Sequence, residues 1–146
     1  MDEDISRKFN AYLNAQTTVN KVQQVIMLYN GIIKHITKVK EAIAENDIQS
    51  RYNFLDKAAA IILGLQTSLD FDKGGEVSKL LDNYYYSIYM RIMSIHNTNS
   101  IEMCDQIIKE LKMMKESWED IDKSVYGVSI NDDEKKSNGS TNKMIG

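Results

Sequence analysis

The feature that most constrains the fold is the absence of proline from all 146 residues. Proline interrupts helices in their interior and is frequent in the turns that connect short strands. Its absence therefore argues against a loop-rich all-β fold and favours long, unbroken helices.

Apolar residues recur at alternating spacings of three and four, which is the pattern of an amphipathic helix. The clearest example begins near Asn20, a good N-cap residue, and continues through Val22, Val25, Tyr29, Ile32, Ile36, Val39 and Ile43. The pair Asn46-Asp47 breaks this pattern and supplies the cap of the next helix. A long helix is predicted over this stretch.

Three further segments show the same periodicity. One runs from Ile48 to Leu69 and stops before Gly74-Gly75, the next runs from Glu76 to about His96, and the last follows Ile107, Leu111, Met114, Trp118, Ile121 and Val125. Connections of a few residues force successive helices to run antiparallel. The sequence thus predicts an all-α fold, an antiparallel up-and-down four-helix bundle over 19–126, with 1–18 as an N-terminal helix or cap segment and 127–146 as a disordered tail.

Composition excludes several classes of function. A net charge of −3 and a pI near 5.4 give no electrostatic reason to expect nucleic acid or an anionic membrane as partner. The N-terminal stretch lacks the apolar core of a signal peptide, and no apolar run approaches the roughly 20 residues of a membrane span. We therefore expect a cytoplasmic protein that does not insert into membranes.

Catalytic and metal-binding motifs are missing from the sequence. His35 and His96 have no glutamate three residues before them, so the Glu-x-x-His motif of di-iron bundles is absent. A single cysteine, Cys104, permits neither an internal disulfide nor a thiolate cluster, and we expect it to be a small buried hydrophobe. The prediction is a protein without enzymatic activity, metal or cofactor, and a bundle enzyme with a metal site is the least favoured alternative.

The segment Asp82–Met93, DNYYYSIYMRIM, holds more apolar surface than one core-facing stripe can use. Advancing by about 100° per residue assigns Tyr84, Ile88 and Ile92 to the core and Tyr85 and Tyr89 to its flank. Tyr86, Met90 and Met93 then point away from the core. The helix near residue 30 has a similar surplus in Ile26, Met27, Leu28 and Ile33. Such surpluses predict a groove that binds a segment of another protein.

Two motifs of the sequence resemble those of the FliS family of flagellar secretion chaperones. The first is Met27-Leu28-Tyr29-Asn30-Gly31 followed by Ile32-Ile33, and the second is Ser68–Glu76 with Leu80, Leu81 and Tyr84 after it. Trp118 stands where those proteins usually carry a tryptophan, and the likeness extends from about Tyr12 to Tyr126. One departure is Thr18-Val19-Asn20-Lys21, where the family usually reads Thr-Ala-Ser-Pro.

The resemblance implies a cytosolic chaperone that binds the disordered C-terminal segment of flagellin and prevents premature polymerisation. It would then aid delivery to the flagellar type III export apparatus, with a component of the export gate as second partner. The partner-binding residues implied here are Tyr12, Met27, Ile33, Tyr85, Tyr89 and Met93, with Tyr12 and Phe9 in a segment that covers the groove until the client displaces it. The alternative is a helical adaptor or regulator of another flagellar or secretion protein. Free protein is expected to be a monomer or a weak homodimer.

Overall fold

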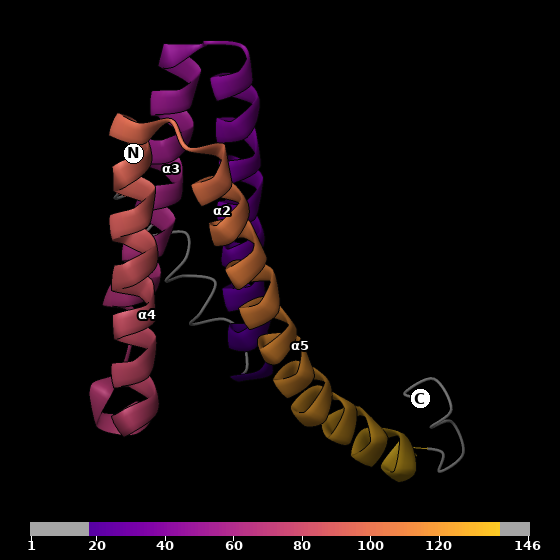
Figure 1. The fold of residues 1–146 in the computed structure, drawn as a ribbon. Coiled ribbons are helices and arrows are strands. Elements are labelled where there is room, and N and C mark those ends of the chain that lie inside the picture. The colour runs from indigo at the N-terminus through magenta and orange to yellow at the C-terminus, as the bar shows by residue number, and fades with distance from the viewer. Residues whose placement is uncertain (1–17, 138–146) are drawn as a thin grey trace. The chain divides into compact units, whose positions relative to one another are not determined.

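The computed structural model describes the backbone of residues 18–137 and the side chains of residues 21–123. This part of the chain contains four helices and no strand: α2 (Thr18–Ala44), α3 (Ile48–Thr67), α4 (Phe71–Thr98) and α5 (Ile101–Ser137) (Figure 1). The predicted all-α fold is confirmed. The predicted N-terminal cap segment, with Phe9 and Tyr12, lies outside the described residues apart from Thr18, which already belongs to α2.

The chain divides into two compact units. One unit, Met27–Met114, contains most of α2, all of α3 and α4, and the first part of α5. The other combines residues 1–26 with 115–146 and includes the N-terminal turns of α2 and the rest of α5. The bundle described below is the Met27–Met114 unit.

Each helix of this unit is joined to its neighbours by side-chain contacts, which fix the order of the helices around the bundle. The His35 ring of α2 stacks on the Phe54 ring of α3, and Gln66 of α3 forms a hydrogen bond with Asp82 of α4. Ion pairs join α4 to α5 through Arg91 and Glu110, and α2 to α5 through Lys40 and Asp105. Successive helices are therefore neighbours, and α5 closes the ring against α2. This is the antiparallel up-and-down bundle that the short connections predicted.

Across the centre of the bundle, α2 meets α4 through two tyrosines. The Tyr29 hydroxyl donates a hydrogen bond to the Tyr85 hydroxyl over 2.9 Å, and the two rings meet edge to face with centroids 6.2 Å apart. Around this pair the buried side chains are almost entirely aliphatic. They are Ile32, Ile36, Val39, Ala42, Leu55, Ala58, Ala59, Ile62, Leu65, Ile88, Ile92, Ile95, Cys104, Ile107 and Leu111.

Three helices begin at side-chain caps, of which the sequence predicted the one at Asn46-Asp47 and did not predict the one at Asp70. Asp47, Asp70 and Ser100 each accept a hydrogen bond from the backbone N–H three residues further on, over 3.0 to 3.1 Å. These bonds satisfy N–H groups that have no partner inside the helix. Asn46 and Asn99, with φ of 56° and 51°, adopt the left-handed conformation that ends α2 and α4.

Gly75 interrupts α4 near its start. Its φ of 52° and ψ of −123° lie outside the helical region, so Phe71–Gly74 form a separate turn before the regular helix. This agrees with the sequence prediction that the long helix starts at Glu76. Residues with a Cβ rarely adopt this conformation.

Replacing Gly75 by alanine is expected to lower the free energy of unfolding by about 1–3 kcal/mol, because an L-residue is strained at this φ and ψ. Gly64 supplies the matched control, since it is helical and a Cβ added there meets nothing within 4 Å. Gly64→Ala should raise the stability by about 0.5–1 kcal/mol. Urea denaturation followed by circular dichroism measures both, and equal stabilities of the two variants would contradict the assignment of strain to Gly75.

The C-terminal helix is longer than predicted. The sequence interpretation ended the bundle at Tyr126 and placed 127–146 in a disordered tail, whereas α5 continues to Ser137. The prediction is therefore wrong for residues 127–137. Polar composition was taken as a sign of disorder, yet Asp, Glu and Lys are compatible with a helix, and only one glycine, Gly127, stands in this stretch.

Candidate partner-binding surface

Tyr85 and Tyr86 are adjacent in the chain but differ in their surroundings. Tyr85 is 2% exposed and belongs to the core, whereas Tyr86 is 56% exposed. The prediction that Tyr85 borders a groove is thus wrong, and Tyr84, which was assigned to the core, is only half-buried. Tyr85 faces the centre of the bundle, where its hydroxyl accepts a hydrogen bond from Tyr29 and its ring meets the Tyr29 ring edge to face.

The outward side of α4 carries the predicted surplus of apolar residues. Met90 is 49% exposed, while Tyr89 and Met93 are half-buried at the edge of the same face. At about 100° per residue, these three and Tyr86 fall within roughly 100° of one another. The prediction that the core does not account for Tyr86 and Met90 is confirmed by their exposure.

Helix α3 extends this apolar face from the other side. The Tyr52 ring packs against the His96 ring with centroids 5.2 Å apart, and one helical length away the Gln66 amide donates to the Asp82 carboxylate over 2.9 Å. These two contacts set an antiparallel register between α3 and α4. That register places Leu63, which is exposed, opposite the turn of α4 that carries Tyr86.

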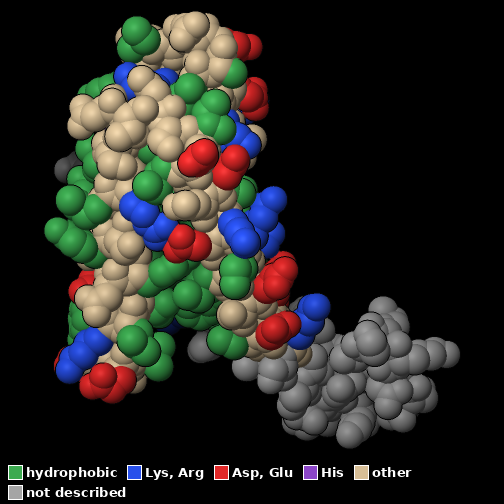
Figure 2. All heavy atoms as spheres, in the orientation of Figure 1, with side chains coloured by type: hydrophobic (Ala, Val, Ile, Leu, Met, Phe, Trp, Pro, Cys, Tyr) green, Lys and Arg blue, Asp and Glu red, His purple; other side chains and the backbone are tan. Residues whose placement is uncertain are grey.

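Together the two helices form one surface, which we call the α3–α4 face. Its members are apolar and exposed or half-buried: Tyr52, Leu63, Tyr86, Tyr89, Met90 and Met93. Figure 2 shows hydrophobic side chains gathered along the side of the molecule where α4 lies, with charged side chains more frequent over α5. A face of this kind, apolar and rich in tyrosine and methionine, is typical of a protein interaction site.

The outward surface of α4 is also poor in charge. Between Asp82 and the end of the helix, Arg91 is the only residue of the Lys, Arg, Asp and Glu type. Its guanidinium turns towards α5, where it donates two hydrogen bonds to the Glu110 carboxylate, one of them over 2.8 Å from Nη2 to Oε1. A solvated helix normally carries charges on its outer face. Here that face is left uncharged.

The Arg91–Glu110 pair predicts a specific dependence of stability on pH. Hydrogen bonds from the guanidinium hold the pKa of Glu110 below the ordinary carboxyl value of 4.5. Because the folded-state pKa is the lower one, the pair stabilises the fold above the unfolded pKa, and this contribution disappears as the pH falls through the folded pKa. Glu110 is 40% exposed, so solvent screening limits the contribution to about 1 kcal/mol or less.

In Glu110→Gln we therefore expect a smaller loss of stability on acidification than in the parent protein, and a reduced stability at neutral pH. Chemical denaturation at a series of pH values below 7 measures this difference. Glu116→Gln is the matched control, since this exposed glutamate on the same helix has no ion pair among the described residues. If both substitutions reduce the pH dependence of stability equally, the Arg91–Glu110 pair is not the cause of that dependence.

The two predicted site residues on α2 lie apart from the α3–α4 face. Met27 is 64% exposed and Ile33 is half-buried. Ile33 lies on the same side of α2 as Lys40, which pairs with Asp105 of α5, and Met27 is turned away from it by about 120°. Of the predicted set, the structure therefore brings Tyr89 and Met93 together, buries Tyr85, and places Met27 and Ile33 elsewhere on the bundle. Tyr12 lies outside the described residues.

Four members of the face were absent from the predicted partner-binding residues. Tyr52 was taken as part of the apolar stripe of the third helix, and Leu63 received no role. Tyr86 and Met90 were predicted to point away from the core but were not assigned to the binding site. A usable signal was present, because Tyr52 and Leu63 are eleven residues apart, which is three full helical turns and hence one face. The core of α3 instead uses Leu55, Ala58, Ala59, Ile62 and Leu65.

Metal-ligand side chains are not clustered within the described residues. No group of three His, Cys, Asp or Glu side chains converges there. Burial of the Cys104 thiol raises its pKa to about 11, so the thiol is protonated at neutral pH, as expected for a small core residue. No described helix is both long and apolar enough to cross a membrane.

The sequence motifs that suggested a family turn out to support the fold. A Cβ at Gly31 would lie 3.2 Å from the Ile61 Cδ1 atom, so this glycine permits the close approach of α2 and α3. Tyr29 of the same motif forms the diagonal pair, and Asp70 and Gly75 of the second motif shape the start of α4. A family model for the flagellar protein FliS matches residues 6–125. The chain belongs to the FliS family.

Several FliS proteins are similar to this chain along most of their length. The flagellar secretion chaperone FliS of Campylobacter jejuni is 32% identical over 115 residues, which cover 77% of this chain and 89% of that protein. The FliS of Vibrio cholerae is 30% identical over 97 residues, covering 66% and 71%, and that of Bacillus subtilis is 26% identical over 115 residues, covering 78% and 85%. Membership of this chaperone family agrees with a bundle that carries an uncovered apolar face.

Proposed function

We propose that this chain is an export chaperone that binds the C-terminal segment of flagellin in the cytoplasm. By covering that segment it prevents premature polymerisation, and it then aids delivery of flagellin to the flagellar type III export apparatus. The observation that supports this proposal is the uncharged α3–α4 face on a member of a family of flagellar secretion chaperones.

The α3–α4 face suits an amphipathic helix of the client. Its six side chains follow two antiparallel helices, so a docked helix can place apolar residues along the seam between them. Flexible methionines adapt to different client side chains, while the tyrosines supply large contact areas with few rotatable bonds. Register is then set by shape, because α4 offers no charge on this face.

The affinity for such a client depends on two opposing contributions to the binding free energy. Burying an exposed apolar side chain contributes about 25 cal/mol per Å² removed from water, while ordering a disordered segment costs several kcal/mol. Contacts with the α3–α4 face alone leave only a modest favourable binding free energy. A client segment that continues around the bundle would bind more tightly through its further contacts. Met27 and Ile33 remain proposed contacts of this second kind.

Chaperoning of this kind works by occupation alone. The segment of flagellin that would pair with other subunits is held on the bundle, and release at the export apparatus exposes it again. The proposal requires no nucleotide hydrolysis, metal or cofactor. An export-gate component is the second proposed partner, which recognises the loaded chaperone.

The proposal is tested by isothermal titration calorimetry of the full chain with the C-terminal segment of flagellin from the same organism. We expect a one-to-one complex with a dissociation constant below about 1 μM. A peptide of the same composition in scrambled order is the control and should not bind. Absence of binding at high micromolar concentrations overturns the proposal, and tight binding of a different flagellar protein instead would establish the adaptor alternative.

A further inference from the structure

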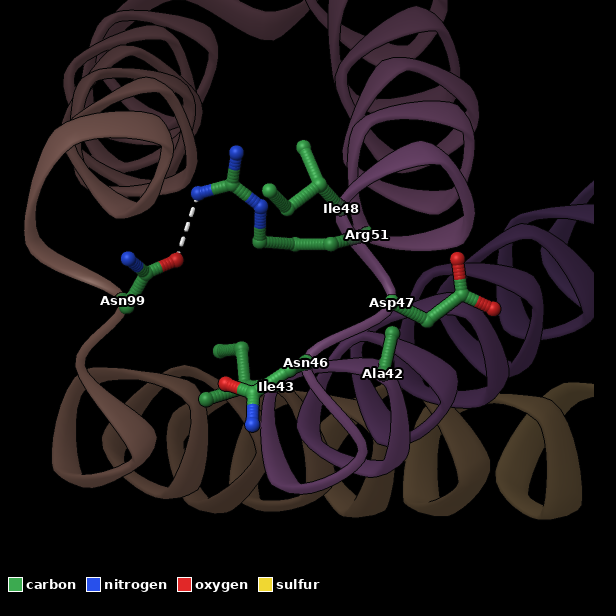
Figure 3. A pocket seen from close by; sticks show the side chains of 7 residues that line it. All are labelled: Ala42, Ile43, Asn46, Asp47, Ile48, Arg51 and Asn99. Carbon is green, nitrogen blue, oxygen red and sulfur yellow. Dashed lines mark hydrogen bonds between the residues drawn. The ribbon is translucent and has the colours of Figure 1, made fainter.

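A cavity lies at the end of the bundle where the α2–α3 and α4–α5 connections meet. It has a volume of about 200 Å³ and is lined by Ala42, Ile43, Asn46, Asp47, Ile48, Arg51 and Asn99. In Figure 3 the aliphatic stem of Arg51 forms one wall, with Ile43 and Asn46 opposite, and the Asp47 carboxylate points away from the cavity. The lining thus combines three aliphatic side chains, Ala42, Ile43 and Ile48, with the polar side chains of Asn46, Asp47, Arg51 and Asn99.

The walls of this cavity are fixed by hydrogen bonds. Arg51 donates from Nη1 to the backbone carbonyl of His96 over 2.9 Å and to the side-chain oxygen of Asn99. Asp47 is held as the N-cap of α3 by the Ser50 backbone and hydroxyl. These hydrogen bonds hold the Nη1 end of the guanidinium against the α4–α5 connection, while the buried Nε atom of Arg51 has no hydrogen-bond partner among the described residues.

Two isoleucines extend the apolar surface outward from the cavity. Ile48 is 70% exposed in the first turn of α3, and Ile101 is exposed in the first turn of α5. Both follow directly on the connections that line the cavity. This bundle end therefore combines a cavity for one side chain with an apolar rim, which is the usual form of an interaction hot spot.

Apart from Arg51, whose guanidinium is bonded to the α4–α5 connection, the charged residues next to the cavity along the chain are acidic. Glu45 directly precedes the cavity residue Asn46, and Glu102 stands in the first turn of α5. Neither has an ion pair within 4 Å among the described residues, whereas Glu41 pairs with Lys38 and Asp105 with Lys40. The last turn of α2 contains no basic residue. Acidic groups at a helix C-terminus are unfavourable to the helix dipole, so Glu41 and Glu45 favour an external cation there.

We propose that this bundle end is a second docking surface, for a protein segment that inserts one aliphatic side chain between flanking Lys or Arg residues. The aliphatic side chain occupies the cavity, and the flanking cations meet Glu45 and Glu102. This surface shares no residue with the α3–α4 face, so we propose that it binds a second partner while the client occupies that face.

The test uses the full chain, isotopically labelled for NMR, and three short peptides: acetyl-KLK-amide, acetyl-KGK-amide and acetyl-ELE-amide. The first is expected to bind with a dissociation constant of about 1 mM and to shift the backbone amide signals of Asn46, Ile48, Asn99 and Ile101. The peptide that lacks the leucine and the peptide of opposite charge should each bind at least about tenfold more weakly. Equal shifts by all three peptides, or none, would overturn the proposal.

A charge-reversal variant supplies the sharper comparison. In the double variant Glu45→Lys, Glu102→Lys the preference should invert, so that acetyl-ELE-amide binds more tightly than acetyl-KLK-amide. The spectrum itself reports whether the variant is folded, and Glu116→Lys on an exposed part of α5 is the control of equal charge change per site. An unchanged preference in the double variant contradicts the role of the two glutamates.

A final titration separates this inference from the proposed chaperone function. The labelled chain is first saturated with the flagellin C-terminal segment, and acetyl-KLK-amide is then added. The amide shifts at the bundle end should persist, because the α3–α4 face and the cavity are separate. If the flagellin segment abolishes them, the cavity belongs to the client site and a second partner is ruled out.

Discussion

Replacing Tyr85 by alanine is expected to lower the free energy of unfolding by about 3–5 kcal/mol, the usual cost of deleting a buried aromatic side chain. The ring is 2% exposed, lies in the core and receives the hydrogen bond from Tyr29. Its neighbour provides the matched control: Tyr86→Ala should change the stability by less than about 0.5 kcal/mol. Urea denaturation followed by circular dichroism measures both.

The result distinguishes the core from the partner-binding surface at two adjacent positions. If Tyr86→Ala destabilises the bundle as much as Tyr85→Ala, the outward assignment of Tyr86 is incorrect. Tyr85→Phe separates packing from hydrogen bonding, because it keeps the ring and removes only the hydroxyl. We expect it to cost about 1 kcal/mol, the typical net value of one hydrogen bond.

The second large effect concerns binding of the client. Introducing a charge at the centre of the α3–α4 face, in the double variant Tyr86→Asp, Met90→Asp, should weaken binding of the flagellin segment by roughly a hundredfold, about 3 kcal/mol. A docked apolar helix would bury both carboxylates without a partner, which is costly. Calorimetry gives the affinity, and circular dichroism verifies that the helices are retained.

Met113→Asp is the control for this variant. Met113 is an exposed methionine on α5, outside the α3–α4 face, so the same change of chemistry there should leave the affinity within about twofold. Equal losses in the control and the double variant would mean that the added charge itself, and not the face, weakens binding. An unaffected double variant would place the client site elsewhere on the bundle.

Periodicity predicted the four helices because each buries a stripe that repeats every three or four residues. The cap at Asp47 was also predicted, because a side-chain acceptor there satisfies one of the first backbone N–H groups, whereas the cap at Asp70 was not. The rotation of α4 about its axis was less well predicted. Tyr84 and Tyr85 differ by about 100°, and only the partner across the bundle, Tyr29, decides which of them is buried.

The α3–α4 face could be only half predicted for a related reason. The surplus on α4 is visible in one helix alone, and so Tyr89 and Met93 were proposed. The contribution of α3 depends on how α3 and α4 are aligned side by side. Tyr52–His96 and Gln66–Asp82 set that alignment, and no local pattern contains it.

The diagonal pair of Tyr29 and Tyr85 has a consequence for how this bundle tolerates an apolar outer surface. A polar group inside an otherwise apolar core can fix the alignment of neighbouring helices along their axes, and a shift by one helical turn amounts to about 5.4 Å. A slide of that size separates two hydroxyls that now lie 2.9 Å apart. The Tyr29–Tyr85 hydrogen bond therefore forms in only one alignment of α2 with α4. The tyrosines and methionines on the outer surface need not contribute to that alignment, and their side chains can adapt to a partner.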